Sequence, residues 1–195
     1  MSNLALDPKT AALLVMDFQI AAVEMIASAT DAFLARTAEV VEAARNAGMR
    51  IIYVVVSFRA GYPELSPKNK SFAPVRESGR FIEGSRATQV HAAVAPKPGD
   101  AVVAKHRVSA FAGTDLDMIL RANGVDTLVL AGLATSGVVL STLRHAADAD
   151  YRLAVVEDCC GDRDAEVHRV LMEKVFARQA TVLKAEEMIA ALRAN

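Results

Sequence analysis

Short apolar runs alternate with segments of helical periodicity along the chain, and this alternation constrains the fold most. The apolar runs predict six strands, at residues 11–16, 51–56, 102–104, 127–131, 153–157 and 181–183. Helices are expected between and after them, at residues 30–47, 115–122, 137–149, 164–178 and 185–194. Strands that alternate with helices are typical of a parallel sheet covered on both faces, because the crossovers are right-handed.

The expected fold is therefore a three-layer α/β/α Rossmann-like domain with a six-stranded parallel sheet in the order 3-2-1-4-5-6. This order reverses between the first and the fourth strand, and open α/β sheets bind ligands at such a point. Asp17 follows the first strand and Gly132 the fourth, so both are expected at one crevice. Thr135 and Ser136 are expected to cap the helix that begins near Gly137.

The composition is that of a globular protein without a nucleic-acid partner. A chain of 195 residues suits a single domain, 1–195, and the formal net charge is only −1. The chain has no apolar run of about 18 residues that would span a membrane. Its amino terminus lacks the features of a signal peptide. Two adjacent cysteines do not build a disulfide framework. These observations predict a cytoplasmic protein that does not bind membranes.

The segment between the second and third strands, at about residues 57–100, is expected to be an irregular insertion. It contains five of the six prolines and is too long for an ordinary connection. Such insertions often form lids or subunit contacts. Its charged residues are expected to be mostly solvated, although a few could steer an anionic substrate.

Three segments carry a family resemblance: LVMDFQ at 14–19, KHRVSAF at 105–111 followed by TDL at 114–116, and GLATSGVVLST at 132–142. Together and in this order they resemble the isochorismatase-like hydrolases, also called the cysteine hydrolase family. The resemblance covers nearly the whole chain. It implies a hydrolase that acts on a small molecule without a cofactor. Members commonly associate, so a homo-oligomer, a dimer or a tetramer, is expected.

Val138 stands where amidase members of this family have their nucleophilic cysteine. A valine cannot form a thioester, which excludes covalent cysteine chemistry at this position. Ser136 and Ser141 are candidate replacements, but a helix cap and a packing role explain them better. Cys159 and Cys160 follow the fifth strand, in the wrong loop for the family's nucleophile, and are expected to be buried and inert.

Asp17 and Lys105 are the candidate catalytic residues. A carboxylate at the end of an apolar strand is partly desolvated, which raises its pKa and suits acid or base chemistry. Lys105 ends the third strand and could pair with Asp17 and bind a substrate oxygen. A capping aspartate and a surface lysine are the alternatives. The resemblance implies that both belong to the catalytic set, with Val138 in the third position.

Several residues beside these motifs are expected to contact the substrate: Phe18, Gln19, Phe58, Arg59, Phe111, Leu133, Ala134, Ser136 and Gly137. Among them, Arg59 could hold a carboxylate. The resemblance also implies a cis peptide between Leu133 and Ala134, which would direct backbone N–H groups at a substrate oxygen. The nicotinamidases of the family bind a metal through histidines beyond the second strand. Residues 57–62 contain no histidine here, so no metal is expected.

Three functions remain open from the sequence. The first is a hydrolase without a covalent intermediate, acting on a small carboxylated, amide or vinyl-ether substrate. True isochorismatases, which also lack the cysteine, cleave a vinyl ether with the first-strand aspartate as the acid, and Asp17 and Lys105 could do comparable work. The second is a binding pseudoenzyme that kept the pocket, and the third is a structural role in an oligomer. The sequence favours them in that order.

Overall fold

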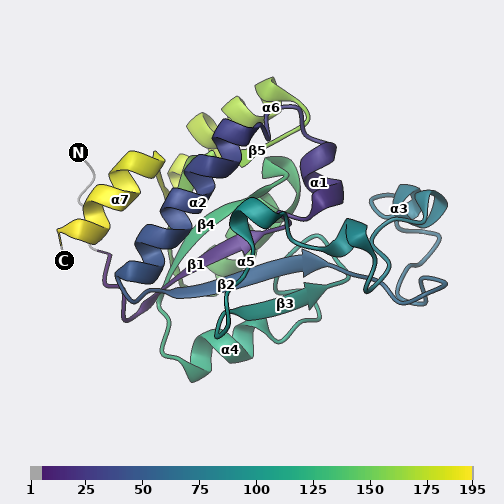
Figure 1. Ribbon diagram of the computed structural model, residues 1–195, viewed down its shortest axis with the longest axis horizontal. Helices are drawn as coiled ribbons and strands as arrows, with labels where there is room; N and C mark the ends of the chain where they lie inside the picture. The colour runs from purple at the N-terminus through teal and green to yellow at the C-terminus, as the bar shows by residue number, and fades with distance from the viewer. Residues whose placement is uncertain (1–5, 195) are drawn as a thin grey trace.

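A six-stranded parallel sheet forms the centre of the computed structural model, which describes residues 6–194 (Figure 1). Its strand order is β3-β2-β1-β4-β5-β6, which confirms the predicted order and the α/β class. All neighbouring strands pair in parallel. The strands are β1 (Ala11–Met16), β2 (Arg50–Val56), β3 (Ala101–Lys105), β4 (Thr127–Leu133), β5 (Arg152–Gly161) and β6 (Thr181–Leu183).

Helices and shorter helical turns connect these strands. The α-helices are α1 (Ile20–Glu24), α2 (Asp31–Asn46), α3 (Ala73–Ser78), α4 (Leu116–Ala122), α5 (Leu140–Asp148), α6 (Ala165–Val170) and α7 (Ala185–Arg193). Short 3₁₀ turns occupy Arg86–Thr88, Ala92–Val94 and Phe176–Arg178, and π-helical turns occupy Thr135–Val139 and Leu171–Val175. No helix among residues 6–194 combines the length and the apolar character needed to cross a membrane.

The two faces of the sheet build two separate cores. β1 is buried along its whole length, as a central parallel strand requires, and its side chains alternate between the faces. Leu13 and Val15 pack with the buried faces of α2 and α7. Leu14 and Met16 pack on the opposite face, with residues of α4, α5 and the segment 171–176. Both layers of helices therefore hold β1 in place, and with it the residue that follows, Asp17.

The strands beside the switch point are longer than predicted. β4 continues past residue 131 to Leu133, and β5 continues past residue 157 to Gly161. Gly132 pairs with Cys160 and Leu133 pairs with Gly161, after a register shift in the ladder. Backbone pairing, rather than an apolar run of side chains, carries both strands to the edge of the crevice.

The predicted cap of the helix after β4 is wrong. A π-helical turn precedes α5, and Gly137 within it has φ −97° and ψ −106°, which is not helical. The Thr135 hydroxyl lies 2.8 Å from Nδ1 of His168, while the Ser136 N–H donates to Asp162 at 2.6 Å. Both residues are therefore tied to the segment after β5. The predicted helix 164–178 is likewise divided, into α6, a π-helical turn and a 3₁₀ turn.

The insertion, residues 57–100, first extends beyond the carboxyl ends of β2 and β3, and its last part, with the turn Ala92–Val94, packs against α2 and returns to the start of β3 (Figure 1). Although it has little regular structure beyond α3, it is packed around a third apolar cluster, here called the insertion core. This core combines aromatic and aliphatic residues of the insertion with residues of α1 and β2, namely Ala21, Ala22, Val56, Phe58, Tyr62, Leu65, Phe72 and Phe81. The insertion therefore has an apolar core of its own beside the crevice at the carboxyl ends of the strands.

Candidate functional site

Asp17 and Lys105 form a buried ion pair at the carboxyl edge of the sheet. Lys105 Nζ lies 2.9 Å from Asp17 Oδ2, and the two side chains are only 2% and 9% exposed, respectively. Asp17 directly follows β1, and its N–H donates to the Val54 carbonyl of β2. Lys105 ends β3 opposite Val56. The predicted convergence of the two side chains is confirmed.

The surroundings of this pair leave donor and acceptor positions open. Lys105 Nζ also donates to the Arg107 carbonyl at 3.2 Å, whereas Asp17 Oδ1 has no hydrogen-bond partner among the described residues. Burial raises the pKa of the Asp17 carboxyl, and the neighbouring Lys105 cation works in the opposite direction. Asp17 therefore holds a proton more readily than an ordinary aspartate, with one oxygen free.

The ion pair opens into a pocket of about 460 Å³ at the carboxyl ends of the strands. Its polar lining comes from Asp17, Lys105, Ser71, Ser136, Asp162 and Arg163. Its apolar lining comes from Ala22, Met25, Ile26, Val56, Phe72, Phe81, Val108, Leu133, Ala134 and Val138, and Gly137 completes the wall. The pocket thus combines charged groups with a large apolar surface, as small-molecule sites do.

Residues at the end of β4 and in the loop after it lie where the sequence predicted them. Leu133, Ala134, Ser136, Gly137 and Val138 all line the pocket, and Val138 shares it with both members of the ion pair. The peptide between Leu133 and Ala134 is cis, as the resemblance implied.

Phe18 and Gln19 do not reach the pocket, in contrast to the prediction. The Phe18 ring is buried and stacks on Phe33 with a centroid distance of 5.9 Å. The Gln19 side chain, wholly buried, donates to the carbonyls of Val56 and Thr88 and accepts from the Val56 N–H at 2.7 Å. It therefore holds the end of β2, and its polar groups are already satisfied.

The predicted substrate contacts of Phe58, Arg59 and Phe111 are also corrected. Phe58 is fully buried in the insertion core. Arg59 is exposed and pairs with Glu64 at 2.9 Å, outside the pocket lining. Phe111 stacks on His145 at 4.4 Å between centroids. Each of these side chains contacts other residues of the protein, and none of the three lines the pocket.

Several pocket residues were not predicted from the sequence, and two groups of them stand out. Asp162 and Arg163 directly follow β5, whose predicted end lay several residues earlier. A longer β5 would have identified them, because the carboxyl end of the strand next to β4 must reach the same crevice. Phe72 and Phe81 come from the insertion. No periodicity distinguishes them there, so the sequence offered no signal for them.

The two cysteines are buried, as predicted, and neither lines the pocket. Burial raises the pKa of the Cys159 thiol to about 12 and raises that of Cys160 as well. A thiol that stays protonated at neutral pH is a poor nucleophile. Residues 6–194 also contain no group of three or more His, Cys, Asp or Glu side chains placed to hold a metal ion.

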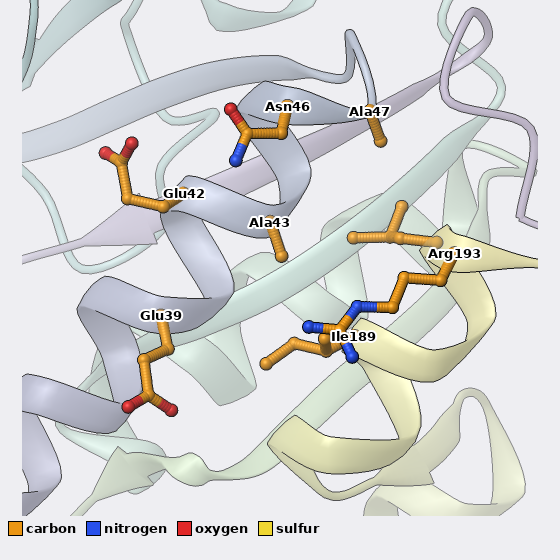
Figure 2. A pocket seen from close by; sticks show the side chains of 8 residues that line it. Glu39, Glu42, Ala43, Asn46, Ala47, Ile189 and Arg193 are labelled. Carbon is orange, nitrogen blue, oxygen red and sulfur yellow. The ribbon is translucent and has the colours of Figure 1, made fainter.

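A second hollow lies between α2 and α7 (Figure 2). Glu39, Glu42 and Arg193 reach it from these helices, above an apolar surface of Ala43 and Ile189. Glu42 is already paired with Lys97. The hollow borders the last turn of α2, which precedes the start of β2 and so lies toward the amino ends of the strands. Ligands of parallel sheets bind at the opposite edge, which makes the Asp17 pocket the candidate active site.

Comparison with known proteins places the fold in a family. The model of the isochorismatase domain matches residues 11–187. The chain belongs to the isochorismatase family. Another isochorismatase family protein, the uncharacterised YecD of Escherichia coli O157:H7, is 32% identical over 191 residues, which cover 97% of this chain and 100% of YecD. The resemblance predicted from the three motifs is confirmed.

Two further comparisons involve proteins that are named as enzymes. The ureidoacrylate amidohydrolase RutB of Methylobacterium radiotolerans is 34% identical, with 88% of this chain and 75% of RutB covered. The crystal structure of N-carbamoylsarcosine amidase from Thermoplasma acidophilum superposes with a TM-score of 0.74 and 30% identity, covering 91% of this chain and 97% of that one. The protein is thus a hydrolase of the isochorismatase family.

Proposed function

We propose that this isochorismatase-family hydrolase cleaves a small amide or vinyl-ether substrate by direct attack of water, without a covalent intermediate. The observation that carries the proposal is the buried Asp17–Lys105 pair in a pocket whose adjoining wall is Val138. An amide is supported by the names of the similar proteins, an amidohydrolase and an amidase. A valine in that wall leaves water as the nucleophile.

Asp17 is proposed as the group that transfers protons. Its Oδ2 is held by Lys105, whereas Oδ1 has no partner among the described residues and is proposed as the oxygen that contacts the substrate. Because burial raises its pKa, the carboxyl can carry a proton to a leaving nitrogen or to a vinyl-ether carbon.

Lys105 is proposed as the electrostatic partner. A lysine ammonium has three N–H donors, and here two of them are directed at Asp17 Oδ2 and the Arg107 carbonyl. The third donor remains for a substrate oxygen that gains negative charge in the transition state. The cation is fixed in advance by these two contacts, so no reorganisation is needed when the charge develops.

Arg163, rather than Arg59 as the sequence predicted, is proposed to bind a substrate carboxylate. It lines the pocket, while Arg59 does not. The guanidinium donates to Met25 Sδ at 2.9 Å. A thioether is a weak acceptor, so a carboxylate that forms two parallel hydrogen bonds would replace it favourably. Arg163 is therefore proposed as the anchor of a carboxylated substrate.

Turnover of a panel of carboxylated amides, esters and vinyl ethers tests the proposed function. With any substrate that the native protein converts, Asp17→Asn should lower kcat by about 10²–10⁴-fold, the usual contribution of a positioned proton donor. Asp117→Asn is the matched control, since Asp117 lies on α4 in an exposed pair with Arg121 and should leave kcat unchanged. Tight binding of panel compounds without turnover would establish the pseudoenzyme instead.

We also propose that the protein forms a homo-oligomer, a dimer or a tetramer. Val138 and Val139, which precede α5, are buried within the same molecule and offer no surface for a partner. Two observations support association. Val102 on the edge strand β3 is 52% exposed, and Met118 on the neighbouring α4 is 68% exposed. Large apolar side chains with such exposure are typical of interfaces when they cluster.

A further inference from the structure

The segment after β5 brings a second carboxylate into the pocket. Asp162 follows directly on Gly161, the last residue of β5, and lines the pocket that contains Asp17. Its Oδ2 accepts the Ser136 N–H at 2.6 Å, a short, charge-assisted contact to the loop after β4. Its Oδ1 accepts only a long contact of 3.4 Å from the Asp164 N–H. The carboxylate is thus held at one oxygen and has acceptor capacity at the other.

We propose that Asp162 is the general base that activates the hydrolytic water. The inference rests on the proposed function, because direct hydrolysis by water needs a group that accepts a proton from the water, and Val138 cannot be that group. A positioned base removes a proton from water while the oxygen attacks. None of the family comparisons assigns a role to this residue.

The composition of the pocket lining supports this assignment by elimination. Its charged side chains are two carboxylates, Asp17 and Asp162, and two cations, Lys105 and Arg163, and no histidine lines it. The cations cannot accept a proton. Asp17 has a single free oxygen, in a carboxyl whose burial favours the protonated form. Because the proton of Asp17 is needed for the leaving group, Asp17 cannot also serve as the base. Asp162 is the base that remains among the described lining residues.

The step balances for an amide substrate. The Asp162 carboxylate takes a proton from water, and the water oxygen forms a bond to the carbonyl carbon as the C=O π electrons move onto oxygen. Lys105 stabilises that oxygen. The C=O bond then reforms, the C–N bond breaks, and the Asp17 carboxyl gives its proton to the departing nitrogen. The products are an acid and an amine. Asp162 returns its proton to solvent, and Asp17 regains one.

Two substitutions separate this catalytic role from a structural one. Asp162→Asn keeps an oxygen that can accept the Ser136 N–H but cannot take a proton. Asp162→Ala removes both functions and leaves a space that formate fills. A general base predicts that kcat falls by about 10²–10⁴-fold in both variants. Formate should then raise the kcat of Asp162→Ala in a saturable manner, while Asp162→Asn should not respond.

Asp164→Asn is the matched control. Asp164 caps α6 through the N–H groups of Glu166 and Val167 and does not line the pocket. Asparagine caps a helix about as well, so this variant removes one negative charge from the same segment and should retain the native kcat. Thermal melting of all variants shows whether they fold. If Asp162→Ala does not fold, Asp162→Ser, which also lacks a carboxylate, takes its place in the formate experiment.

Each outcome decides between the two proposals. Native-like turnover by Asp162→Asn, or a folded Asp162→Ala that formate does not rescue, overturns the assignment of the base while the role of Asp17 stands. A native protein that converts no compound of the panel overturns the proposed function, and the inference about Asp162 with it. Loss of kcat in both variants together with rescue of Asp162→Ala alone supports the assignment.

Discussion

Asp17 links the chemistry of the site to the stability of the protein. Burial raises the pKa of its carboxyl in the folded state above the value of about 3.9 in an unfolded chain. The folded state therefore binds more protons at this residue than the unfolded state. The contribution of this residue to the free energy of unfolding is therefore fully present below a pH of about 3.9. It is lost as the pH rises through the pKa that the carboxyl has in the folded state.

Comparison with Asp17→Asn isolates this contribution, because the variant cannot titrate at position 17. The free energy of unfolding of the native protein, minus that of the variant, should decrease as the pH rises from about 4. Chemical denaturation at a series of pH values measures the difference. An increase with pH would show that Lys105, rather than burial, dominates the ionisation of Asp17.

Val138 allows a direct test of the alignment that places it at the position of the family's cysteine. Val138→Cys should acquire a reactive thiol, because Lys105 and the N–H groups of the turn 135–139 would stabilise a thiolate in the shared pocket. Its pKa should lie below the free value of about 8.5.

Iodoacetamide labelling as a function of pH measures this thiol, and the native protein is the control. Burial keeps the native thiols protonated, Cys159 up to a pKa of about 12, so the native protein should resist labelling. A variant that reacts no faster than native Cys159 and Cys160 would show that the loop 132–142 was aligned wrongly.

At the scale of elements, the packing of β4 against β1 requires that residue 132 is a glycine, which has no side chain. A Cβ atom at Gly132 would lie 3.1 Å from Met16 Cβ, from the Met16 carbonyl oxygen and from Val139 Cγ2. The first two atoms cannot move without shifting β1. Gly132→Ala should therefore destabilise the protein by about 1–3 kcal/mol, as overpacking does, and lower Tm by about 2–4 °C per kcal/mol. An unchanged Tm would show that β1 and β4 can separate without cost.

The same elements show what the sequence could and could not predict. The alternation of strands and helices predicted the sheet and its order, and the switch point then brought Asp17 and the loop after β4 together. The family resemblance implied that Lys105 and Val138 belong to the same site. The ends of β4 and β5 were missed because backbone pairing extends them through Gly132, Cys160 and Gly161. That error hid Asp162 and Arg163. The contacts predicted for Phe18 and Phe58 failed for a different reason, since sequence neighbours of a motif can point into the core.

At the scale of the whole molecule, sedimentation tests the proposed self-association. A single chain has a mass of 20.8 kDa, and we expect a larger species at micromolar concentration. The sheet edge at β3 is the expected contact, because it exposes Val102. Val102→Glu, which would place a buried charge in that contact, should shift the population toward the single chain. A native species of 20.8 kDa would contradict the proposal.

The insertion core has a consequence for how this pocket can diversify. Phe72 and Phe81 contribute to the pocket wall while packing with Phe58 and Tyr62, in a cluster separate from the two cores of the sheet. Asp17, by contrast, is positioned by β1 in the main body. Substitutions at Phe72 and Phe81 can therefore reshape one side of the pocket and generate new substrate ranges on an unaltered reaction centre.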